Sequence, residues 1–427
     1  MWRLLLVGAF PYPLAQGSQV YLQEQAQALR AAGDEITLLT YGQRGGPNAS
    51  QTSATTATAQ ATTERALAGL ENRTSPHWMA PRRTASGPGW GKPLADLGLA
   101  MTLRDALASK SPAARYNAIL THNAEACVIA LGVRQILRQA RSIPIVYCAH
   151  TLLGEELPTY LSSYFRKVNR NSSRVPGAFR GRLSARLGRQ LDRWLARHAD
   201  AWIALTQSAE RVMRRHSLVP GERIPPPMLD PETESRGGAP FLPSAGGGLE
   251  PSPYFLYSGN LDGYQDLALL RATAERLAAT GDSPRIVVAT HDTRARRQAA
   301  LGPGLEVRIV ESAEEARTLL AGARASLLTR RAEGGFPIKL VNSLALGVPP
   351  IALRAREWGL EHGRNAWIGS LQDPVGSLCE GIRVLATDTA LATRLGRGAR
   401  ALYLAEHTPA VAAARTHALL EQVIGLV

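Results

Sequence analysis

Cysteine is scarce in this sequence. Only three cysteines occur in 427 residues, and no two of them are close together along the chain. A disulfide framework and a structural zinc site both need cysteines in paired or clustered spacing. Cys127, Cys148 and Cys379 therefore argue against both kinds of site, and they agree with a reducing cytosol.

Motifs for common cofactors and targeting signals are missing as well. The sequence has no G-x-G-x-x-G fingerprint, which disfavours a dinucleotide-dependent oxidoreductase. It has no Walker, H-E-x-x-H or G-x-S-x-G motif. The opening MWRLLLVGAF is too short to span a membrane and leads into Pro11 and Pro13 without a signal-peptide cleavage pattern. We expect a first strand there, in a cytoplasmic protein.

Acidic residues are outnumbered by basic ones. The chain has 35 Asp and Glu against 49 Lys and Arg, which gives a formal net charge of +14. An excess of this size attracts polyanions, anionic lipid surfaces and phosphorylated substrates alike. Hydrophobic residues make up 45% of the chain, so it can build two domains with cores of their own. The charge indicates three classes of partner without choosing among them.

Strand-like and helix-like segments alternate along most of the chain, which predicts parallel α/β domains. Residues 4–10 (LLLVGAF) form a continuous apolar run typical of a central strand. A helix from about residue 20 to residue 32 and the strand EITLLT follow. Residues 43–64 consist mostly of Ser, Thr, Ala, Gln and Gly, and 76–93 mix tryptophans and bases with Pro and Gly. We interpret this region, near 43–92, as a flexible insertion.

Two histidines stand where predicted strands end. His122 and Asn123 close the strand NAILTHN, and His150 closes IPIVYCAH before the segment that contains Glu155. In open parallel sheets, ligands collect at the carboxyl ends of the strands. These residues are therefore candidates for a binding site. The alternative for each histidine is a structural role.

The most informative stretch is 330–352, RRAEGGFPIKLVNSLALGVPPIA, which follows the short apolar run ASLLT. It predicts a strand, a loop and a helix, with Pro337 at the first helical position and two glycines that let a ligand approach the backbone. A helix start presents free N–H groups and a positive dipole end, so it suits a phosphate. Lys339 adds a full charge one turn inside the helix, and Asn342 lies on the same face. The alternative is an ordinary βα unit with a capped helix.

This stretch resembles the donor-site signature of retaining GT-B glycosyltransferases of glycosyltransferase family 4. The resemblance implies a GT-B fold, in which two Rossmann-like α/β domains face each other across a cleft. The first acid of that signature corresponds either to Glu333, with one extra loop residue, or to Gly334. The second acid is replaced by Asn342, which can hydrogen-bond ribose hydroxyls but lacks the charge that strengthens such bonds.

The resemblance also implies roles for residues elsewhere in the chain. It places His122 and Glu333 near the donor sugar as the catalytic candidates. Asn123, His150 and Glu155 are the acceptor-side candidates. Donor binding falls to Gly17 and Ser18 of the first βαβ unit, which Gln16 precedes, and to Arg331, Gly335, Phe336, Pro337, Ile338, Lys339 and Asn342.

The chemistry that the resemblance implies is sugar transfer from a nucleoside-diphosphate sugar, with retention. Charge that develops on the leaving diphosphate must be stabilised in the transition state. Many family members use an arginine and a lysine in and after the first turn of the second domain, where this chain has Asn260, Asp262, Tyr264, Gln265 and Asp266. Lys339, the helix start and Arg330 or Arg331 remain to stabilise that charge. No D-x-D pair is present to hold manganese, so we expect neither a metal nor a cofactor beside the co-substrate.

Residues 166–197 are rich in arginine, and their second half predicts a helix. Leucines recur there at intervals of four, at Leu183, Leu187, Leu191 and Leu195. We expect these leucines to face the core and the arginines to face solvent. The resemblance places this segment where many lipid-directed GT-B enzymes meet the membrane, so an anionic membrane surface is a candidate partner. A merely solvated charged face is the alternative.

Composition and resemblance together divide the chain into domains. We expect an N-terminal acceptor domain over 1–222, a linker over 223–252, a donor domain over 253–405 and a helix over 406–427 that crosses back to the first domain. The predicted function is a cytoplasmic, membrane-associated hexosyltransferase that acts on a glycan or lipid-linked acceptor in polysaccharide or glycolipid biosynthesis, with no nucleic acid partner. Two alternatives are a nucleotide-sugar epimerase of similar fold and a non-catalytic protein that binds sugar nucleotides or polyanions.

Overall fold

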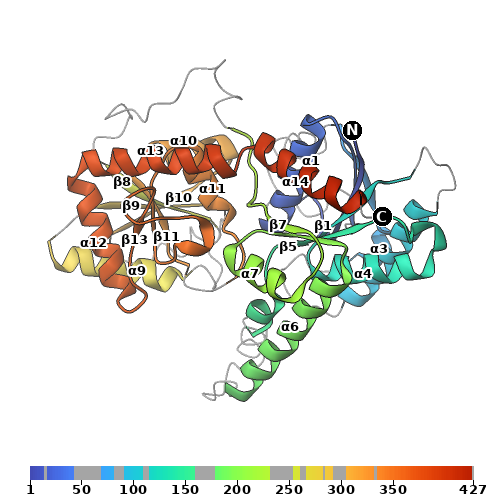
Figure 1. Ribbon diagram of the computed structural model, residues 1–427. Coiled ribbons are helices and arrows are strands. Elements are labelled where there is room, and N and C mark those ends of the chain that lie inside the picture. Colours follow the sequence, from blue (N-terminus) through green and yellow to red (C-terminus); the bar gives the residue numbers. More distant parts are fainter. Residues whose placement is uncertain are drawn as a thin grey trace. The chain divides into compact units, whose positions relative to one another are not determined.

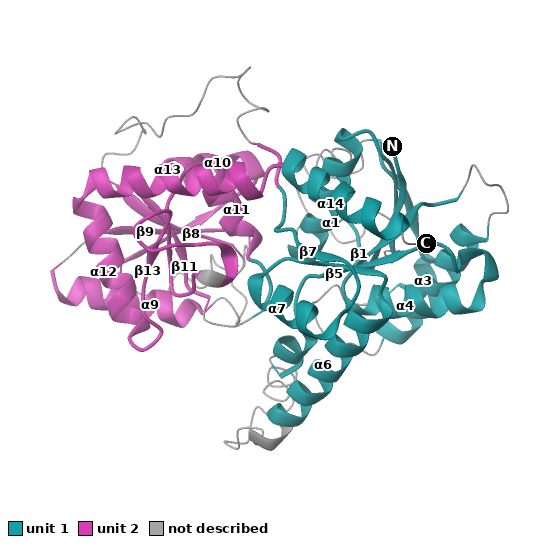
Figure 2. Ribbon diagram, in the orientation of Figure 1, with its two compact units in different colours: residues 1–227, 334–336, 409–427 teal, residues 228–333, 337–408 magenta. Residues whose placement is uncertain are grey.

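The computed structural model contains two compact units, each with one parallel β-sheet (Figure 1). It describes residues 1–13, 17–42, 69–80, 91–108, 115–158, 178–230, 253–259, 266–281, 284–291, 304–330 and 334–425. Unit 1 comprises 1–227, 334–336 and 409–427, and unit 2 comprises 228–333 and 337–408 (Figure 2). The predicted α/β class with two parallel-sheet domains is confirmed.

Seven strands form the sheet of unit 1, in the order β3-β2-β1-β4-β5-β6-β7. Every neighbouring pair is parallel. The strands are β1 (Arg3–Pro11), β2 (Glu35–Tyr41), β3 (Glu71–Thr74), β4 (Ala118–His122), β5 (Ile145–Ala149), β6 (Ala201–Ala204) and β7 (Gly221–Arg223). The central strands β4, β5 and β6 are buried at every residue, because helices cover both faces of a parallel sheet.

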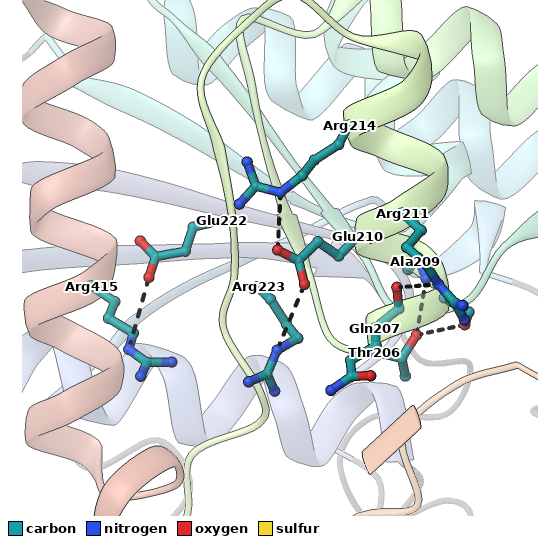
Figure 3. Close-up of polar contacts among 10 residues, drawn as sticks. Thr206, Gln207, Ala209, Glu210, Arg211, Arg214, Glu222, Arg223 and Arg415 are labelled. Carbon is teal, nitrogen blue, oxygen red and sulfur yellow. Dashed lines mark hydrogen bonds and ion pairs between the residues drawn. The ribbon is translucent and has the colours of Figure 1, made fainter. Parts of the chain in front are cut away.

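The helices of unit 1 include one from the far end of the chain. They are α1 (Gly17–Ala31), α3 (Lys92–Leu107), α4 (Ala124–Ile136), α6 (Ala178–His198), α7 (Gln207–His216) and α14 (Pro409–Ile424), with short 3-10 turns η1 (His77–Met79) and η3 (Arg138–Ala140). α14 packs against α1. Polar contacts add to this packing: His417 of α14 bonds through Nε2 to Oδ2 of Asp34 at 2.6 Å, and Arg415 lies 3.8 Å from Glu222 (Figure 3).

Part of the region interpreted as a flexible insertion is structured. Residues 71–74 form β3 at the edge of the sheet, and Thr37 of β2 donates its hydroxyl hydrogen bond to Glu71 at 2.9 Å. The sequence ENRT has no apolar residue, so the strand depends on backbone pairing with β2 and carries no hydrophobic signal. Residues 43–68 and 81–90 of the same region lie outside the described residues.

The prediction that the leucines of α6 face the core is wrong for three of the four. Leu183, Leu187 and Leu191 are 49%, 50% and 44% exposed, whereas Leu195 is fully buried. The reason is geometric: a spacing of four residues advances about 40° around a helix per step, so Leu195 lies about 120° from Leu183. The buried face of α6 is formed by Ser184, Gly188, Asp192, Leu195 and Ala196. The N-terminal part of α6 extends away from the rest of unit 1 (Figure 2).

Unit 2 has a six-stranded sheet in the order β10-β9-β8-β11-β12-β13. Its strands are β8 (Tyr254–Ser258), β9 (Arg285–Thr290), β10 (Leu305–Ile309), β11 (Ala325–Leu328), β12 (Pro350–Ala352) and β13 (Trp367–Ile368). Its helices are α9 (Leu267–Ala279), α10 (Ala313–Ala321), α11 (Ile338–Ala345), α12 (Pro374–Thr387) and α13 (Thr389–Glu406), with the turn η6 (Arg356–Trp358). Alternate residues of β8 enter two separate cores: Phe255 and Tyr257 join one, Tyr254 and Leu256 the other.

No helix within the described ranges is both long and apolar enough to cross a membrane. The predicted linker is described only as far as Asp230, and its residues 231–252 lie outside the described part.

Candidate functional site

The strand orders of the two sheets locate a candidate site in each unit. In unit 1 the order reverses between β1 and β4, and in unit 2 it reverses between β8 and β11. Ligands of open α/β sheets bind outside the carboxyl ends of the strands at this switch point. A ligand is therefore expected at the loops after β1 and β4 in unit 1 and at those after β8 and β11 in unit 2.

Backbone strain occurs beside both switch points. Among the described non-glycine residues, only Asn123 and Asp266 have a positive φ, of 96° and 54°. Asn123 directly follows β4, and Asp266 precedes α9, the helix that follows β8 in the described chain. Asn123, with ψ of 167°, occupies a region that only glycine enters freely, at a cost of about 1–3 kcal/mol. Such strain persists where the surrounding structure enforces it, often at functional sites.

The side chain of Asn123 is used within the fold. Its Oδ1 accepts a hydrogen bond from the N–H of Ala126 at 3.0 Å and so caps the start of α4. This contact explains a polar residue after β4 without any ligand. The amide nitrogen of Asn123 and the second lone pair of its Oδ1 remain for the acceptor-side role that the resemblance implied.

His122 and His150 form a buried pair. The two residues end or follow β4 and β5, and they are 0% and 7% exposed. Nδ1 of His122 lies 3.1 Å from Nε2 of His150, which is a hydrogen-bond distance. Tyr21 of α1 packs against both rings, with centroid distances of 5.2 Å to His122 and 4.8 Å to His150. Sequence reasoning predicted two separate roles for these histidines, and the structure joins them.

Burial keeps both imidazoles neutral. Desolvation, followed by the neighbouring His150, lowers the pKa of His122 well below its usual value. Desolvation also lowers the pKa of His150 to about 3. A group that is neutral across the physiological range of pH can exchange hydrogen bonds with a hydroxyl group, but it does not supply a positive charge to an anion.

The remaining candidates of unit 1 are spread around the same edge of the sheet. Gly17 is exposed at the first residue of α1, and Ser18 follows it, half-buried. Glu155 lies half-buried in the short helical segment 153–158. Gln16 lies outside the described residues. The structure thus places Gly17 and Ser18 after β1 and His122 at the last residue of β4, on the two sides of the switch point.

A polar cluster after β6 is held together by contacts within unit 1. Thr206 caps α7 by accepting from the N–H of Ala209 at 3.2 Å, as Figure 3 shows. Glu210 pairs with Arg214 at 3.0 Å and with Arg223 at 3.8 Å. Both guanidiniums are therefore held by the same carboxylate, and these contacts account for the cluster within the fold.

In unit 2, Lys339 reaches the carboxyl end of β8. Its ammonium nitrogen lies 4.3 Å from the ring centre of Tyr257. A Cβ placed on Gly259, the residue after β8, would be 3.8 Å from the same nitrogen. Desolvation, followed by the charge of Arg330 after β11, lowers the pKa of Lys339 to about 7. An anion bound there would stabilise the charged form of the amine.

The predicted strand, loop and helix around Lys339 are present, but the helix begins one residue later than expected. Pro337 is the N-cap and Ile338 the first residue of α11, so Pro337 still leaves no N–H without a partner. Gly335 has φ of 69°, a conformation in which a side chain would be strained. Phe336, which follows, is buried.

Asn342 lies three residues after Lys339, on the same face of α11. Both residues line a cavity of about 20 Å³ with Ser258, Ser326 and Ser343, which has room for a single water molecule. Glu333 and Arg331 lie outside the described residues, so the structure does not say which residue takes the place of the first acid.

A larger cavity, of about 510 Å³, lies elsewhere in unit 2. It is lined by Leu277, Arg285, Leu305 and Glu306, at the amino ends of β9 and β10. Ligands of parallel sheets bind at the opposite edge, so we assign no donor role to this cavity.

Two tyrosines at the candidate sites were missed by the sequence reasoning. Tyr21 and Tyr257 are 1% and 0% exposed and lie on the inward faces of α1 and β8. Helical and strand periodicity could have placed both in the core, but periodicity does not show which core tyrosine touches His122 or Lys339. Among the residues whose placement is described, no three His, Cys, Asp or Glu side chains are grouped so that they could hold a metal ion.

Comparisons with known proteins agree with this architecture. Residues 16–226 match the model of a glycosyl transferase 4-like domain, and 252–388 match that of glycosyl transferases group 1. No curated protein sequence matches the chain.

Solved structures share the fold at low sequence identity. Sucrose-phosphate synthase from Thermosynechococcus elongatus has a TM-score of 0.68 and 15% identity, with 100% of each chain covered. HepE of Anabaena in complex with UDP and glucose has a TM-score of 0.61 and 14% identity, covering 99% of this chain and 100% of that one. The lipopolysaccharide outer core galactosyltransferase WaaB has a TM-score of 0.59 and 13% identity, with 100% of each chain covered. The two family domains and this shared fold place the chain among the GT-B glycosyltransferases with a family 4-like N-terminal domain.

Proposed function

We propose that this glycosyltransferase moves a sugar from a nucleoside-diphosphate sugar to a glycan or lipid-linked acceptor, with retention and without a metal or further cofactor. The observation that carries the proposal is the position of Lys339. Its amine lies at the carboxyl end of β8, beside the switch point of the sheet in unit 2. The start of α11, one residue away, contributes N–H groups and a positive dipole end.

These groups match the charge that the reaction creates. When the glycosidic bond to the donor breaks, negative charge builds up on the leaving diphosphate. The Lys339 amine, the first N–H groups of α11 and the Arg330 guanidinium supply positive charge on one side of the sheet. Asn342, on the same face of α11 as Lys339, replaces the family's second acid toward the ribose. For His122 of unit 1 we keep the role that the resemblance implied, a hydrogen bond from a neutral imidazole to the donor sugar.

The known relatives suggest which nucleotide to test first. The structures of HepE contain UDP, UDP with glucose, and UDP-glucose. We propose a uridine nucleotide as the donor of this chain as well. Binding of a ligand at about 100 times its Kd stabilises a folded protein by roughly 2.7 kcal/mol, which a thermal-unfolding experiment detects.

The test is thermal unfolding with UDP, GDP and ADP and their sugar conjugates, with and without manganese. We expect a shift with one nucleotide that does not need manganese, that is lost in Lys339→Met and that Lys339→Arg largely retains. Lys92→Met is the matched control, because Lys92 belongs to unit 1 and pairs with Glu125. No shift with any nucleotide would contradict the proposal and favour the non-catalytic alternative.

Acceptor dependence separates the transferase from its alternatives. Donor turnover that requires an added glycan or glycolipid supports transfer, whereas conversion of the donor sugar without an acceptor supports an epimerase. Binding to heparin that disappears at moderate salt, with no nucleotide specificity, supports a polyanion-binding protein. Retention is read from the anomeric configuration of the product.

We also propose that unit 1 binds the cytoplasmic face of an anionic membrane through α6. The exposed side of this helix has two adjacent rows. One row is apolar and consists of Leu183, Leu187, Leu191 and Trp194, each 38–50% exposed. The other row is basic and consists of Arg182, Arg186, Arg189, Arg193 and Arg197, none of which has a carboxylate partner among the described residues.

Charge decides between a membrane and a second copy of the chain as the partner of this face. Two copies that met along the leucine row would bring two arginine rows close together, and like charges repel. At an anionic lipid surface, the leucines can insert into the membrane interface. Each arginine near the surface then adds about 1 kcal/mol of favourable electrostatic binding energy.

Vesicle co-sedimentation tests this face of α6. We expect binding to phosphatidylcholine vesicles that contain phosphatidylglycerol and little binding to phosphatidylcholine alone. Leu187→Ser with Leu191→Ser, and separately Arg182→Gln with Arg186→Gln, should each reduce it. The matched control is Leu97→Ser with Met101→Ser on α3, which changes residues that are 53% and 42% exposed. Equal binding by the α6 variants and the wild type would contradict the proposal, and concentration-dependent dimers without lipid binding would favour the second copy.

A further inference from the structure

The buried histidine pair of unit 1 and the tyrosine packed against it have three polar atoms without a hydrogen-bond partner among the described residues. Nε2 of His122, Nδ1 of His150 and the hydroxyl of Tyr21 are buried and have no hydrogen-bond partner within the described structure. Buried polar groups are nearly always hydrogen-bonded, so each exception needs an explanation. The cluster lies where β4 and β5 end, at the carboxyl edge of the sheet.

The hydrogen bond between the two rings couples their protonation. A neutral imidazole carries one proton, on either Nδ1 or Nε2. If the proton of the shared bond belongs to Nδ1 of His122, then Nε2 of His150 must be bare, and His150 carries its own proton on Nδ1. If the proton belongs to Nε2 of His150, then Nδ1 of His122 must be bare, and His122 carries its own proton on Nε2. Both rings therefore always have the same tautomer.

The two outer nitrogens consequently have opposite roles. When both protons are on Nδ1, the outer nitrogen of His122 accepts a hydrogen bond and that of His150 donates one. When both are on Nε2, the roles are exchanged. His122 can thus change from acceptor to donor without gaining a charge, provided that His150 changes at the same time.

We propose that His150 is a positioning residue that sets the tautomer of His122, so that the pair works as one neutral hydrogen-bonding unit. The ring of Tyr21 packs against both imidazoles and helps to fix their relative orientation. This assignment replaces the acceptor-side role expected for His150. The coupling of the two tautomers follows from the 3.1 Å contact between the rings' nitrogens and does not depend on the proposed function. Only the expected effect of His150 on catalysis rests on the proposed function.

Nitrogen NMR of histidine-labelled protein tests the coupling without any assay of activity. The chemical shifts of Nδ1 and Nε2 show which nitrogen carries the proton, and signals are assigned by substituting each histidine in turn. His417 is an internal reference, because its Nε2 must carry a proton to donate to Asp34. We expect His122 and His150 to be neutral and to share one tautomer at mildly alkaline pH. Different tautomers in the two rings would overturn the proposal.

Two substitutions of His150 extend the test. His150→Gln can still hydrogen-bond to His122, whereas His150→Leu cannot. We expect His150→Leu to alter the nitrogen shifts of His122 and His150→Gln to preserve them. Unchanged shifts of His122 in His150→Leu would overturn the proposal, and if that variant does not fold, the wild-type spectrum still decides.

Kinetics connect the pair to the reaction. In a transfer assay, His150→Leu should lower kcat by about tenfold or more, as an incorrect histidine tautomer does in other enzymes, with the KM for the donor little changed. His150→Gln should recover most of the loss. A fall in thermal stability without any fall in kcat would show a purely structural role and contradict the proposal. If the wild type transfers no sugar at all, the proposed function fails while the NMR result still stands.

Discussion

The amine of Lys339 lies 4.3 Å from the ring centre of Tyr257, so a side chain from α11 reaches across to the end of β8. The aromatic face favours the charged form of the amine by about 0.5–2 kcal/mol. Desolvation and Arg330 oppose this and lower the pKa of Lys339 to about 7. The charge of this lysine therefore changes around neutral pH.

This pKa predicts that donor binding depends on pH. Below pH 7 the amine is already charged, and a nucleoside-diphosphate sugar binds it directly. Above the pKa of about 7, binding must bring a proton to Lys339, so the affinity should fall by up to about tenfold per pH unit. Calorimetry in buffers of different ionisation enthalpy measures this proton uptake. Lys339→Arg is the control, because arginine keeps its charge and should remove the dependence.

The buried histidines predict a loss of stability in acid. The unfolded chain binds protons at histidine below about pH 6.5, whereas His150 in the folded protein stays neutral down to about pH 3. The free energy of unfolding should therefore decrease as the pH falls below about 6.5, by up to about 1.4 kcal/mol per pH unit for each such histidine. Urea denaturation at several pH values measures this slope. A shallower slope is expected in His150→Gln, and an unchanged slope would show that the loss arises elsewhere.

The strained backbone of Asn123 predicts opposite effects of two small substitutions. Asn123→Ala keeps the unfavourable φ and removes the cap of α4, so it should lower stability by about 0.5–2 kcal/mol. Asn123→Gly also loses the side chain, but it relieves strain of about 1–3 kcal/mol and should be neutral or stabilising. Chemical denaturation of both variants distinguishes them. Equal losses would mean that strain contributes little at this position.

The contact between Asp34 and His417 predicts coupling between the two ends of unit 1. The Asp34 carboxylate is fully buried and accepts from the N–H of Trp2 at 2.8 Å as well as from His417. His417→Ala should cost about 1–3 kcal/mol, because it removes a partner of a buried charge. In a double-mutant cycle with Asp34→Asn, the combined loss should be smaller than the sum of the single losses. Additive losses would show that the contact does not stabilise the unit.

Local patterns were sufficient to predict the sheet cores. Continuous apolar runs such as residues 4–10 and 143–149 correspond to buried strands β1 and β5, because a parallel strand covered on both faces has no polar side. The polar edge strand β3 was missed for the same reason, since its pairing with β2 involves the backbone and its side chains carry no apolar pattern.

Contacts between distant segments were not predictable from spacing. His122 and His150 are 28 residues apart, and only the pairing of β4 with β5 brings Nδ1 of His122 to 3.1 Å from Nε2 of His150. The prediction that the leucines of α6 are buried was wrong for a different reason. Residues spaced four apart indicate a helix, but each one is rotated about 40° from the one before it. The series of leucines therefore contains both exposed and buried members. Whether a leucine is exposed depends on which side of the helix is covered by neighbouring elements, and the spacing of the leucines does not show which side that is.

The membership of α14 in unit 1 has a consequence for synthesis of the protein. Translation completes the seven strands of unit 1 by Arg223, yet α14, which covers α1, emerges from the ribosome only after all of unit 2. Until then, the face of α1 that α14 covers is open to solvent and to chaperones. The first domain to begin folding is thus the last to be finished, and a ribosome that stops near residue 408 releases a chain whose N-terminal domain lacks one of its covering helices.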